Sequence, residues 1–144
     1  MGTYLNPGND GFREVLNGKY VDKTGLISEI NNRIDTMEKL VCISRPRRFG
    51  KSFAAKMLCA YYDHSYDSAA LFDKLEISKD ESYRTHLNQY NVIALDIAGI
   101  ISEMVKNKKD LSDMPQILSE AIRLELIEYC PEIKNKDNLA NAFI

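Results

Sequence analysis

Gly50, Lys51 and Ser52 are the residues whose types and order point most directly to chemistry in this chain of 144 residues. Glycine adopts positive φ and lets a backbone approach an anion closely. A lysine carries a flexible point charge that can reach the β and γ phosphates of a nucleotide. A serine hydroxyl suits Mg²⁺, which prefers oxygen ligands. The triplet therefore predicts a phosphate-binding site with Lys51 as the catalytic residue and Ser52 as a Mg²⁺ ligand.

The segments on both sides of the triplet have the patterns needed to position it. Residues 40–43 form a short continuous apolar run, which is typical of a strand buried on both faces. Residues 52–62 place Phe53, Met57, Leu58 and Tyr61 at helical spacing, on one core-facing stripe. Strand, loop, Gly-Lys-Ser and helix are the layout of a phosphate-binding loop. The layout favours an anion because the first amides of a helix have no partner within it and lie at the positive end of its dipole.

The loop departs from the general pattern of such sites at one position. That pattern has a glycine five residues before Gly50, where this chain has Arg45. We infer that the loop takes a different path, with the ring of Pro46 fixing its φ near about −65°. The alternative without a ligand-binding role is a turn followed by an ordinary helix. Arg45, Arg47 and Arg48 add positive charge to the loop, and the alternatives for them are a solvated turn or a nucleic-acid patch.

Residues 45–52, Arg-Pro-Arg-Arg-Phe-Gly-Lys-Ser, resemble the Walker A loop of the predicted AAA-ATPase-like family of P-loop proteins. Residues 20–24 (Tyr-Val-Asp-Lys-Thr), 71–77 and 91–96 also fit that family's pattern, in which Arg45 is no departure. The resemblance implies an α/β fold, a three-layer P-loop NTPase core with a parallel sheet, and ATP and Mg²⁺ as cofactors. It places the cofactor-binding residues at Arg45, Arg47, Arg48, Phe49, Gly50, Lys51, Ser52 and Phe53.

A second central strand is expected over residues 91–97, an apolar, β-rich run that contains Asp96 near its end. Asp96 stands where α/β proteins place ligand groups. It has two interpretations: a weak candidate for a Mg²⁺ ligand, as the Walker B carboxylate, or a residue that ends the strand or senses the ligand. The family pattern favours the second, because there the Walker B strand, a hydrophobic run into Asp-Glu, comes later.

No such acidic run follows Asp96, so the resemblance predicts that the chain is the N-terminal part of the domain, truncated before the Walker B strand. Residues 1–38 would be an arm and helix, and residues 39–144 a partial nucleotide-binding core. Phosphoryl transfer needs a residue that orients water as well as charge stabilisation. We therefore expect ATP binding here and hydrolysis only in a longer parent protein. The resemblance implies a C-terminal PD-(D/E)xK-type nuclease domain in that parent, and a role with nucleic acid rests on analogy alone.

Two other functions are compatible with the same residues. One is a module that holds nucleotide, or docks a partner with its arginine loop, without turnover. The other is a kinase for nucleotides or small molecules, in which Asp96 is the acid at the metal site.

Residues 20–24 precede a helix expected to run from Asp22, as its N-cap, to Arg33. Tyr20 and Asp22 would then be an anchor and a cap, and the functional alternative is that this arm lies against the nucleotide base. Further helices are expected over residues 12–16, 69–75, 116–130 and 138–144, with Pro115 in the first turn of the third. A helix or loop is expected over residues 100–107.

The composition argues against several classes of protein. The net charge is −2, so no bulk positive charge indicates a nucleic acid or a membrane as partner. No apolar run approaches the roughly 18 residues of a membrane span, and residues 1–9 lack a signal-peptide core, so we expect a cytoplasmic protein. The cysteines at 42, 59 and 130 are expected to be core residues rather than metal ligands. His64 and His86 have no visible catalytic partner.

Overall fold

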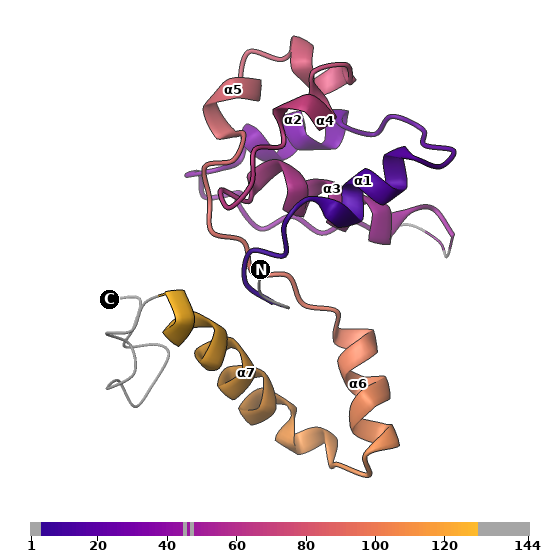
Figure 1. Cartoon of the computed structure of the whole chain (residues 1–144), viewed down its shortest axis with the longest axis vertical. Coiled ribbons are helices and arrows are strands. Elements are labelled where there is room, and N and C mark those ends of the chain that lie inside the picture. Colours follow the sequence, from indigo (N-terminus) through magenta and orange to yellow (C-terminus); the bar gives the residue numbers. More distant parts are fainter. Residues whose placement is uncertain (1–3, 45, 47, 130–144) are drawn as a thin grey trace. The chain divides into compact units, whose positions relative to one another are not determined.

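The computed structural model describes residues 4–44, 46 and 48–129. They fall into two compact units, one formed by residues 6–92 and the other by the described residues of 2–5 and 93–144. The helices of the first unit are α1 (Asp10–Leu16), α2 (Gly25–Asn31), α3 (Lys51–Tyr62), α4 (Ala69–Phe72), the 3₁₀ helix η1 (Glu76–Lys79) and α5 (Tyr83–His86). Those of the second are α6 (Ile97–Lys106), the 3₁₀ helix η2 (Leu111–Asp113) and α7 (Met114–Tyr129) (Figure 1).

The predicted parallel sheet is wrong for the part of the chain that the structure describes. Its backbone forms only two isolated bridges, Leu5 with Ile93 and Asp63 with Tyr90, and otherwise helices and irregular segments. The α/β three-layer assignment is therefore corrected to a helical architecture.

Exposure of the two predicted strands gives the physical reason for this difference. Leu40 is 91% exposed and Ile43 is 38% exposed, so the run at 40–43 is not buried on both faces. Ile93 and Leu95, in the second run, are 46% and 42% exposed. A β-prone run forms a strand only where neighbouring strands pair with it and cover it. Apolar character alone does not supply those neighbours.

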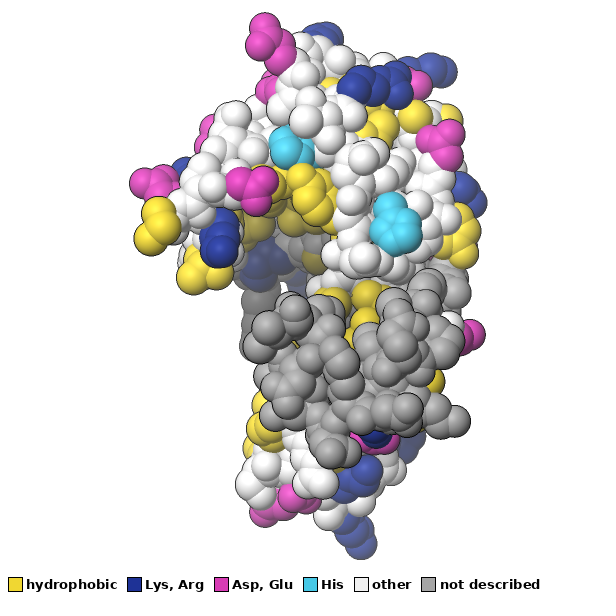
Figure 2. Space-filling view, turned by 90° about the vertical axis from the view of Figure 1, so that its left-hand side faces the viewer, with side chains coloured by type: hydrophobic (Ala, Val, Ile, Leu, Met, Phe, Trp, Pro, Cys, Tyr) yellow, Lys and Arg dark blue, Asp and Glu magenta, His cyan; other side chains and the backbone are white. Residues whose placement is uncertain are grey.

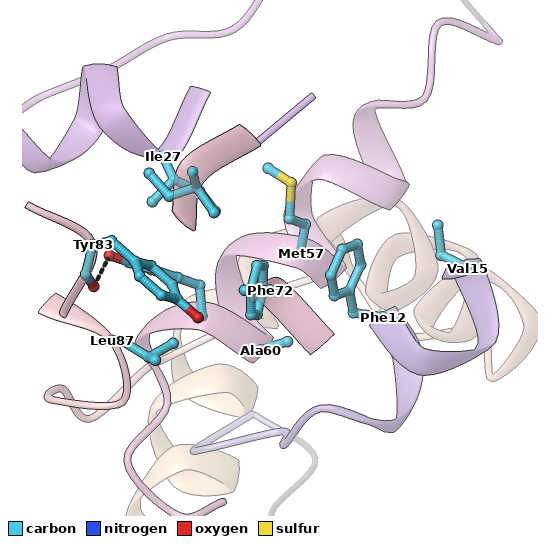
Figure 3. Close-up of a cluster of buried hydrophobic side chains, with 10 residues drawn as sticks. Phe12, Val15, Ile27, Met57, Ala60, Phe72, Tyr83 and Leu87 are labelled. Atoms are coloured by element: carbon cyan, nitrogen blue, oxygen red, sulfur yellow. Dashed lines mark hydrogen bonds between the residues drawn. The ribbon is translucent and has the colours of Figure 1, made fainter. Parts of the chain in front are cut away.

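Helix α3 is the centre of the core of the first unit. It begins one residue earlier than predicted, and Met57, Ala60 and Tyr61 on it are buried. Phe12 of α1 stacks on Phe72 of α4, with ring centroids 5.0 Å apart, and the Tyr61 ring meets Phe72 edge-on at 5.4 Å. Figure 3 shows Phe12 and Phe72 gathered with Met57 and Ala60 of α3. The predicted apolar stripe of the helix therefore packs as expected over its C-terminal two thirds.

Buried hydroxyl groups on α3 are tied to the helices around it. The Tyr61 hydroxyl donates to the Tyr83 carbonyl at 2.7 Å and accepts from the Asn31 side chain at 3.1 Å. The Tyr62 hydroxyl donates to the Asn31 Oδ1 atom at 2.6 Å. Burial, with the neighbouring Tyr61 and Tyr90, raises the pKa of Tyr62. These bonds remove the cost of burying polar atoms and fix the register of α2 and α5 against α3.

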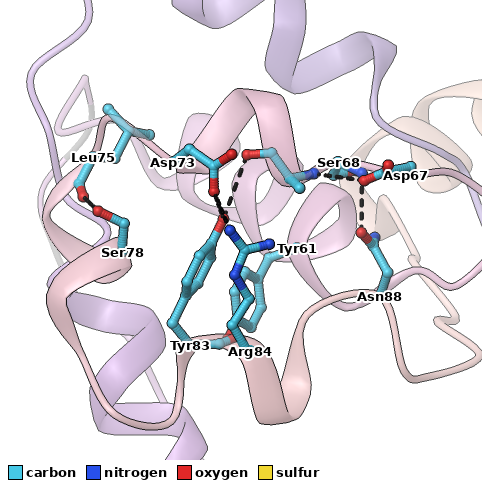
Figure 4. Close-up of polar contacts among 10 residues, drawn as sticks. Tyr61, Asp67, Ser68, Asp73, Leu75, Ser78, Tyr83, Arg84 and Asn88 are labelled. Atoms are coloured by element: carbon cyan, nitrogen blue, oxygen red, sulfur yellow. Dashed lines mark hydrogen bonds and ion pairs between the residues drawn. The ribbon is translucent and has the colours of Figure 1, made fainter.

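Two polar clusters connect the helices that follow α3 in the sequence (Figure 4). The Asp73 carboxylate accepts from the Tyr83 hydroxyl at 3.0 Å and from Arg84 at 2.7 Å. The Asn88 side chain accepts from the Ser68 amide at 2.9 Å and donates to the Asp63 carbonyl at 2.6 Å. They hold α4, α5 and the end of α3 in one block.

The chain enters and leaves the first unit at one place. The Asn6 amide donates to the Val92 carbonyl at 2.8 Å, and the Val92 amide donates back to the Asn6 Oδ1 atom at 2.8 Å. The Asn6 side chain also donates to Asn91 Oδ1 at 2.9 Å. We call this set of bonds the Asn6 clamp.

The second unit confirms the helix expected at 116–130 with shifted bounds, and of the helix or loop expected at 100–107 it shows a helix, α6. Pro115 stands in the first turn of α7, as predicted. The amides of Tyr4 and Leu5 donate to the Glu125 carboxylate on α7, at 2.9 and 2.7 Å. The helix predicted at 138–144 lies outside the described residues.

Candidate functional site

The loop before α3 turns into the helix through Gly50, whose φ of 77° and ψ of 25° are left-handed. Only glycine adopts this conformation without strain. The first bond of the helix runs from the Ala54 amide to the Gly50 carbonyl at 2.9 Å. The amides of the turn before Ala54 therefore have no acceptor within the helix, which is the arrangement that the Gly-Lys-Ser triplet predicts.

The loop has a second left-handed residue, two positions earlier. Arg48 has a φ of 67°, and a non-glycine residue there costs about 1–2 kcal/mol. The Lys51 Nζ atom donates back across the loop to the Pro46 carbonyl at 3.0 Å. Arg45 and Arg47 lie outside the described residues. The path differs from an ordinary helix start, because it combines two positive φ values with a lysine that crosses the bend.

The side chains at the start of α3 are exposed rather than packed. Phe49 is 59% exposed and Phe53 is 52% exposed, while Lys51 and Ser52 are also exposed. Phe53 therefore leaves the core stripe that the helical spacing predicts for it. All the described residues of the predicted cofactor-binding set lie on this one loop and helix end, where they are accessible to a ligand.

The arm at residues 20–24 is held against η1 by two side chains. The Asp22 carboxylate accepts from the Thr24 amide and hydroxyl at 2.9 and 2.7 Å, and from the Glu76 amide at 2.7 Å. The Thr24 hydroxyl oxygen accepts from the Ile77 amide at 3.1 Å. Partial burial acts to raise the pKa of Asp22, but the bonds from Thr24 and Glu76 outweigh it and lower that pKa. Thr24, not Asp22 as predicted, is the N-cap residue of α2.

Lys23 lies between these two anchored residues and reaches the loop. Its Nζ atom donates to the Phe49 carbonyl at 3.0 Å. A Cβ atom placed on Gly50 would lie 3.2 Å from the same nitrogen. The sequence interpretation did not assign Lys23 to the site, although it stands inside the Tyr-Val-Asp-Lys-Thr segment that carries part of the resemblance.

Two hollows flank the contact between the arm and the loop. One, of about 170 Å³, is lined by Tyr20, Val21 and Lys23 of the arm together with Arg48, Phe49 and Phe53. The other, of about 430 Å³, also contains Lys23 and Gly50 and extends to Leu26 and Ile43. The larger volume lies within the roughly 300–1,000 Å³ typical of ligand pockets. Residues of the arm and of the loop therefore line the same two hollows.

Asp96, the weak candidate for a Mg²⁺ ligand, is the N-cap of α6 in the second unit. Its carboxylate accepts from the Gly99 amide at 3.0 Å. A Cβ atom on Gly99 would lie 2.7 Å from the Asp96 Oδ2 atom, so the glycine leaves room for this cap. Ser52, the other predicted ligand, lies in the first unit on the first turn of α3. Residues 4–44, 46 and 48–129 contain no group of three or more His, Cys, Asp or Glu residues suited to a metal ion.

The two histidines lie within hydrogen-bond distance of polar side chains, and the described cysteines are free thiols. Both imidazoles are visible at the surface in Figure 2. His64 Nε2 lies 2.7 Å from Asn91 Oδ1, and His86 Nδ1 lies 2.5 Å from the Tyr90 hydroxyl. Cys42 is exposed, contrary to the prediction, and Cys59 is half-buried, while the cysteine at 130 lies outside the described residues. Burial, with Asp63 nearby, raises the pKa of the Cys59 thiol, which lowers its reactivity.

None of the described helices combines the length and apolar character that crossing a membrane requires.

Comparison with known proteins identifies the family of this chain. No curated protein and no solved structure matches the chain. The model of the AAA-ATPase-like family, described as predicted AAA-ATPases, matches residues 8–143. This match spans α1 to α7 and includes both the arm and the loop, so the chain belongs to the AAA-ATPase-like family.

Proposed function

We propose that this chain binds ATP, with the phosphates at the loop over residues 45–52. The observation that carries the proposal is the left-handed Gly50 that opens α3 with Lys51 and Ser52 beside it. A helix start of this kind offers amides and a partial positive charge to an anion. Lys51 would bind the β and γ phosphates, and Arg48 would add charge beside them.

The residues present fit Mg²⁺ as part of the ligand rather than as an ion held by the protein alone. Ser52 is exposed on the first turn of α3 and offers a hydroxyl oxygen. Mg²⁺ in nucleotide sites is usually bound through one or two protein oxygens together with phosphates and waters. Ser52 would hold the metal through its hydroxyl oxygen, and the ion would supply positive charge beside the phosphates.

The base of the nucleotide would lie against the arm. Tyr20 and Val21 line the smaller hollow with Phe53 and Met57 of α3. An apolar surface with a phenol at its edge suits a planar heterocycle, because aromatic rings bury area and stack. The base would thus be read by the arm while the phosphates are held by the loop.

Hydrolysis requires more than this site supplies. Residues 44–53 contain no acidic side chain, and the Asp22 carboxylate of the arm is bonded to Thr24 and Glu76. A group that orients the attacking water is a necessary part of phosphoryl transfer to water. We therefore assign ATP binding to these residues and ATP hydrolysis to the longer protein, and a non-hydrolysing nucleotide-binding module is the second candidate.

A titration of the chain with MgATP, with the heat of binding measured by calorimetry, tests the proposal. Lys51→Ala should weaken MgATP binding about tenfold or more, since hydrogen bonds to charged groups contribute about 1.5–3 kcal/mol. Lys56→Ala is the matched control, because Lys56 lies on the same helix, exposed, with its Nζ atom 3.9 Å from Glu14. Equal affinities for the wild-type chain and the Lys51 variant would contradict the proposed function. Release of phosphate that disappears in the Lys51 variant would contradict the assignment of hydrolysis to a longer protein.

A further inference from the structure

Lys23 brings a second ammonium group to the phosphate loop from a different part of the chain. Its Nζ atom lies 3.0 Å from the Phe49 carbonyl and 3.2 Å from the place where a Cβ atom of Gly50 would stand. In the proposed site, Gly50 is where the lack of a side chain would let an anion approach the backbone closely. Lys23 is therefore within contact distance of the loop glycine without belonging to the loop.

The arm holds this lysine in place. Asp22 and Thr24, on either side of Lys23, are both bonded to the amides at the start of η1, at 2.7 and 3.1 Å. With its neighbours fixed on η1, Lys23 extends the other way, to the loop. Ordering a lysine on a ligand costs conformational entropy of both its side chain and its backbone. Because the backbone of the arm is already anchored, the backbone part of this cost is smaller for Lys23.

The charge of Lys23 is directed at the loop rather than used in an ion pair. The described residues place no carboxylate within ion-pair distance of its Nζ atom, and the charge that acts on Asp22 comes from Lys79. An ammonium group has three N–H donors, and the Phe49 carbonyl accepts one of them. Two donors and a full positive charge can then serve a ligand at Gly50.

We propose that Lys23 is a second phosphate-binding lysine, which contacts the β or γ phosphate from the arm, in addition to Lys51. The inference rests on the proposed function, because it assigns a new residue to the same nucleotide site. It makes the arm part of the phosphate site as well as of the base site. A nucleotide with a full phosphate chain would link the arm to the loop, whereas one without the β and γ phosphates would not.

Competition of MgATP and AMP with a fluorescent ATP analogue tests this role. Lys23→Gln removes the charge and should weaken MgATP binding about tenfold, as expected for a lost hydrogen bond to a charged group. It should change the affinity for AMP by less than about twofold, because AMP lacks the β and γ phosphates. Lys23→Arg keeps the charge and should restore most of the MgATP affinity. Lys74→Gln, at an exposed lysine that lines neither hollow, controls for the change in net charge.

Each outcome separates the role of Lys23 from the function itself. If Lys23→Gln binds MgATP as Lys74→Gln does, while Lys51→Ala has lost affinity, the assignment of Lys23 is wrong and the function stands. If MgATP and AMP lose affinity equally in Lys23→Gln, the arm has been displaced and the phosphate contact is also wrong. If the wild-type chain binds no nucleotide, both the function and the role of Lys23 fail.

Discussion

The two ends of α3 have opposite surroundings. At the C-terminal end, Ala60 and Tyr61 are fully buried, and the Tyr61 hydroxyl is bonded on both sides. At the N-terminal end, Lys51 and Phe53 are exposed, and the chain arrives through two residues with positive φ. One helix thus joins a closed core to an open loop.

This contrast separates a strained loop from a packed core. Left-handed residues such as Arg48 persist only when the surrounding structure determines the backbone. The aromatic cluster of Phe12, Tyr61 and Phe72 packs in the core around the same helix. Stability and ligand binding should therefore respond to changes at different ends of α3.

Replacing an aromatic residue at each end gives the largest expected difference. Tyr61→Ala removes a fully buried ring and should lower the free energy of unfolding by about 3–5 kcal/mol. Phe53→Ala changes a side chain that is 52% exposed, so its effect on that free energy should stay within about 1 kcal/mol. Urea unfolding followed by circular dichroism measures both.

Nucleotide binding completes this test. Phe53→Ala should weaken MgATP binding, because Phe53 lines the smaller hollow, although the fold is kept. Similar losses of stability for the two variants would show that the ends of α3 are not divided in this way.

Two glycines allow a matched test of the loop backbone. Gly50→Ala forces alanine into a left-handed conformation and should lower the free energy of unfolding by about 1–2 kcal/mol. Its Cβ atom would also crowd Lys23 Nζ at 3.2 Å. Gly25→Ala is the control, because a Cβ atom there meets only Glu76 Oε2 at 3.8 Å and helical glycine-to-alanine changes often stabilise by about 0.4–1 kcal/mol. A Gly50 variant as stable as the Gly25 variant would argue against the left-handed turn.

The anchor of the arm gives the smallest effect, and it depends on pH. The pKa of Asp22 in the folded chain is below its usual value of 3.8. Its stabilising contribution is therefore complete above that value and is lost as the pH falls through the folded pKa. The difference in thermal midpoint between the wild-type chain and Asp22→Asn should be largest near neutral pH and should shrink in acid. A difference that stays constant with pH would exclude ionised Asp22 as the anchor.

The Gly50 turn and the helix that follows it could be predicted from sequence because their signals are local. The positive φ that Gly50 can take and a helix over residues 52–62, which in the structure begins one residue earlier, follow from residue type and spacing within about a dozen residues. The family was likewise recognisable from residues 45–52 and 20–24. These features need no knowledge of what packs against them.

The errors concern features that depend on distant partners. The run at 40–43 has the apolar character of a buried strand, yet Leu40 is 91% exposed, because no described strand pairs with it. Asp96 looked like a strand end and instead begins α6, where the small Gly99 permits the cap. The contact of Lys23 with Phe49 joins residues 26 positions apart. The pattern of residues 20–24 could suggest a functional segment but not the atom that its lysine meets.

The Asn6 clamp has a consequence for how the first unit could be handled in the laboratory. Since the backbone at 6 and the backbone at 92 are hydrogen-bonded to each other, the unit has adjoining ends, as do domains that tolerate insertion and circular permutation. Residues 6–92 contain α3, the arm and the loop. In a circularly permuted form, a short linker would join residues 6 and 92, and new termini would be opened at an exposed turn. The contact between Lys23 and Phe49 would stay within this one unit.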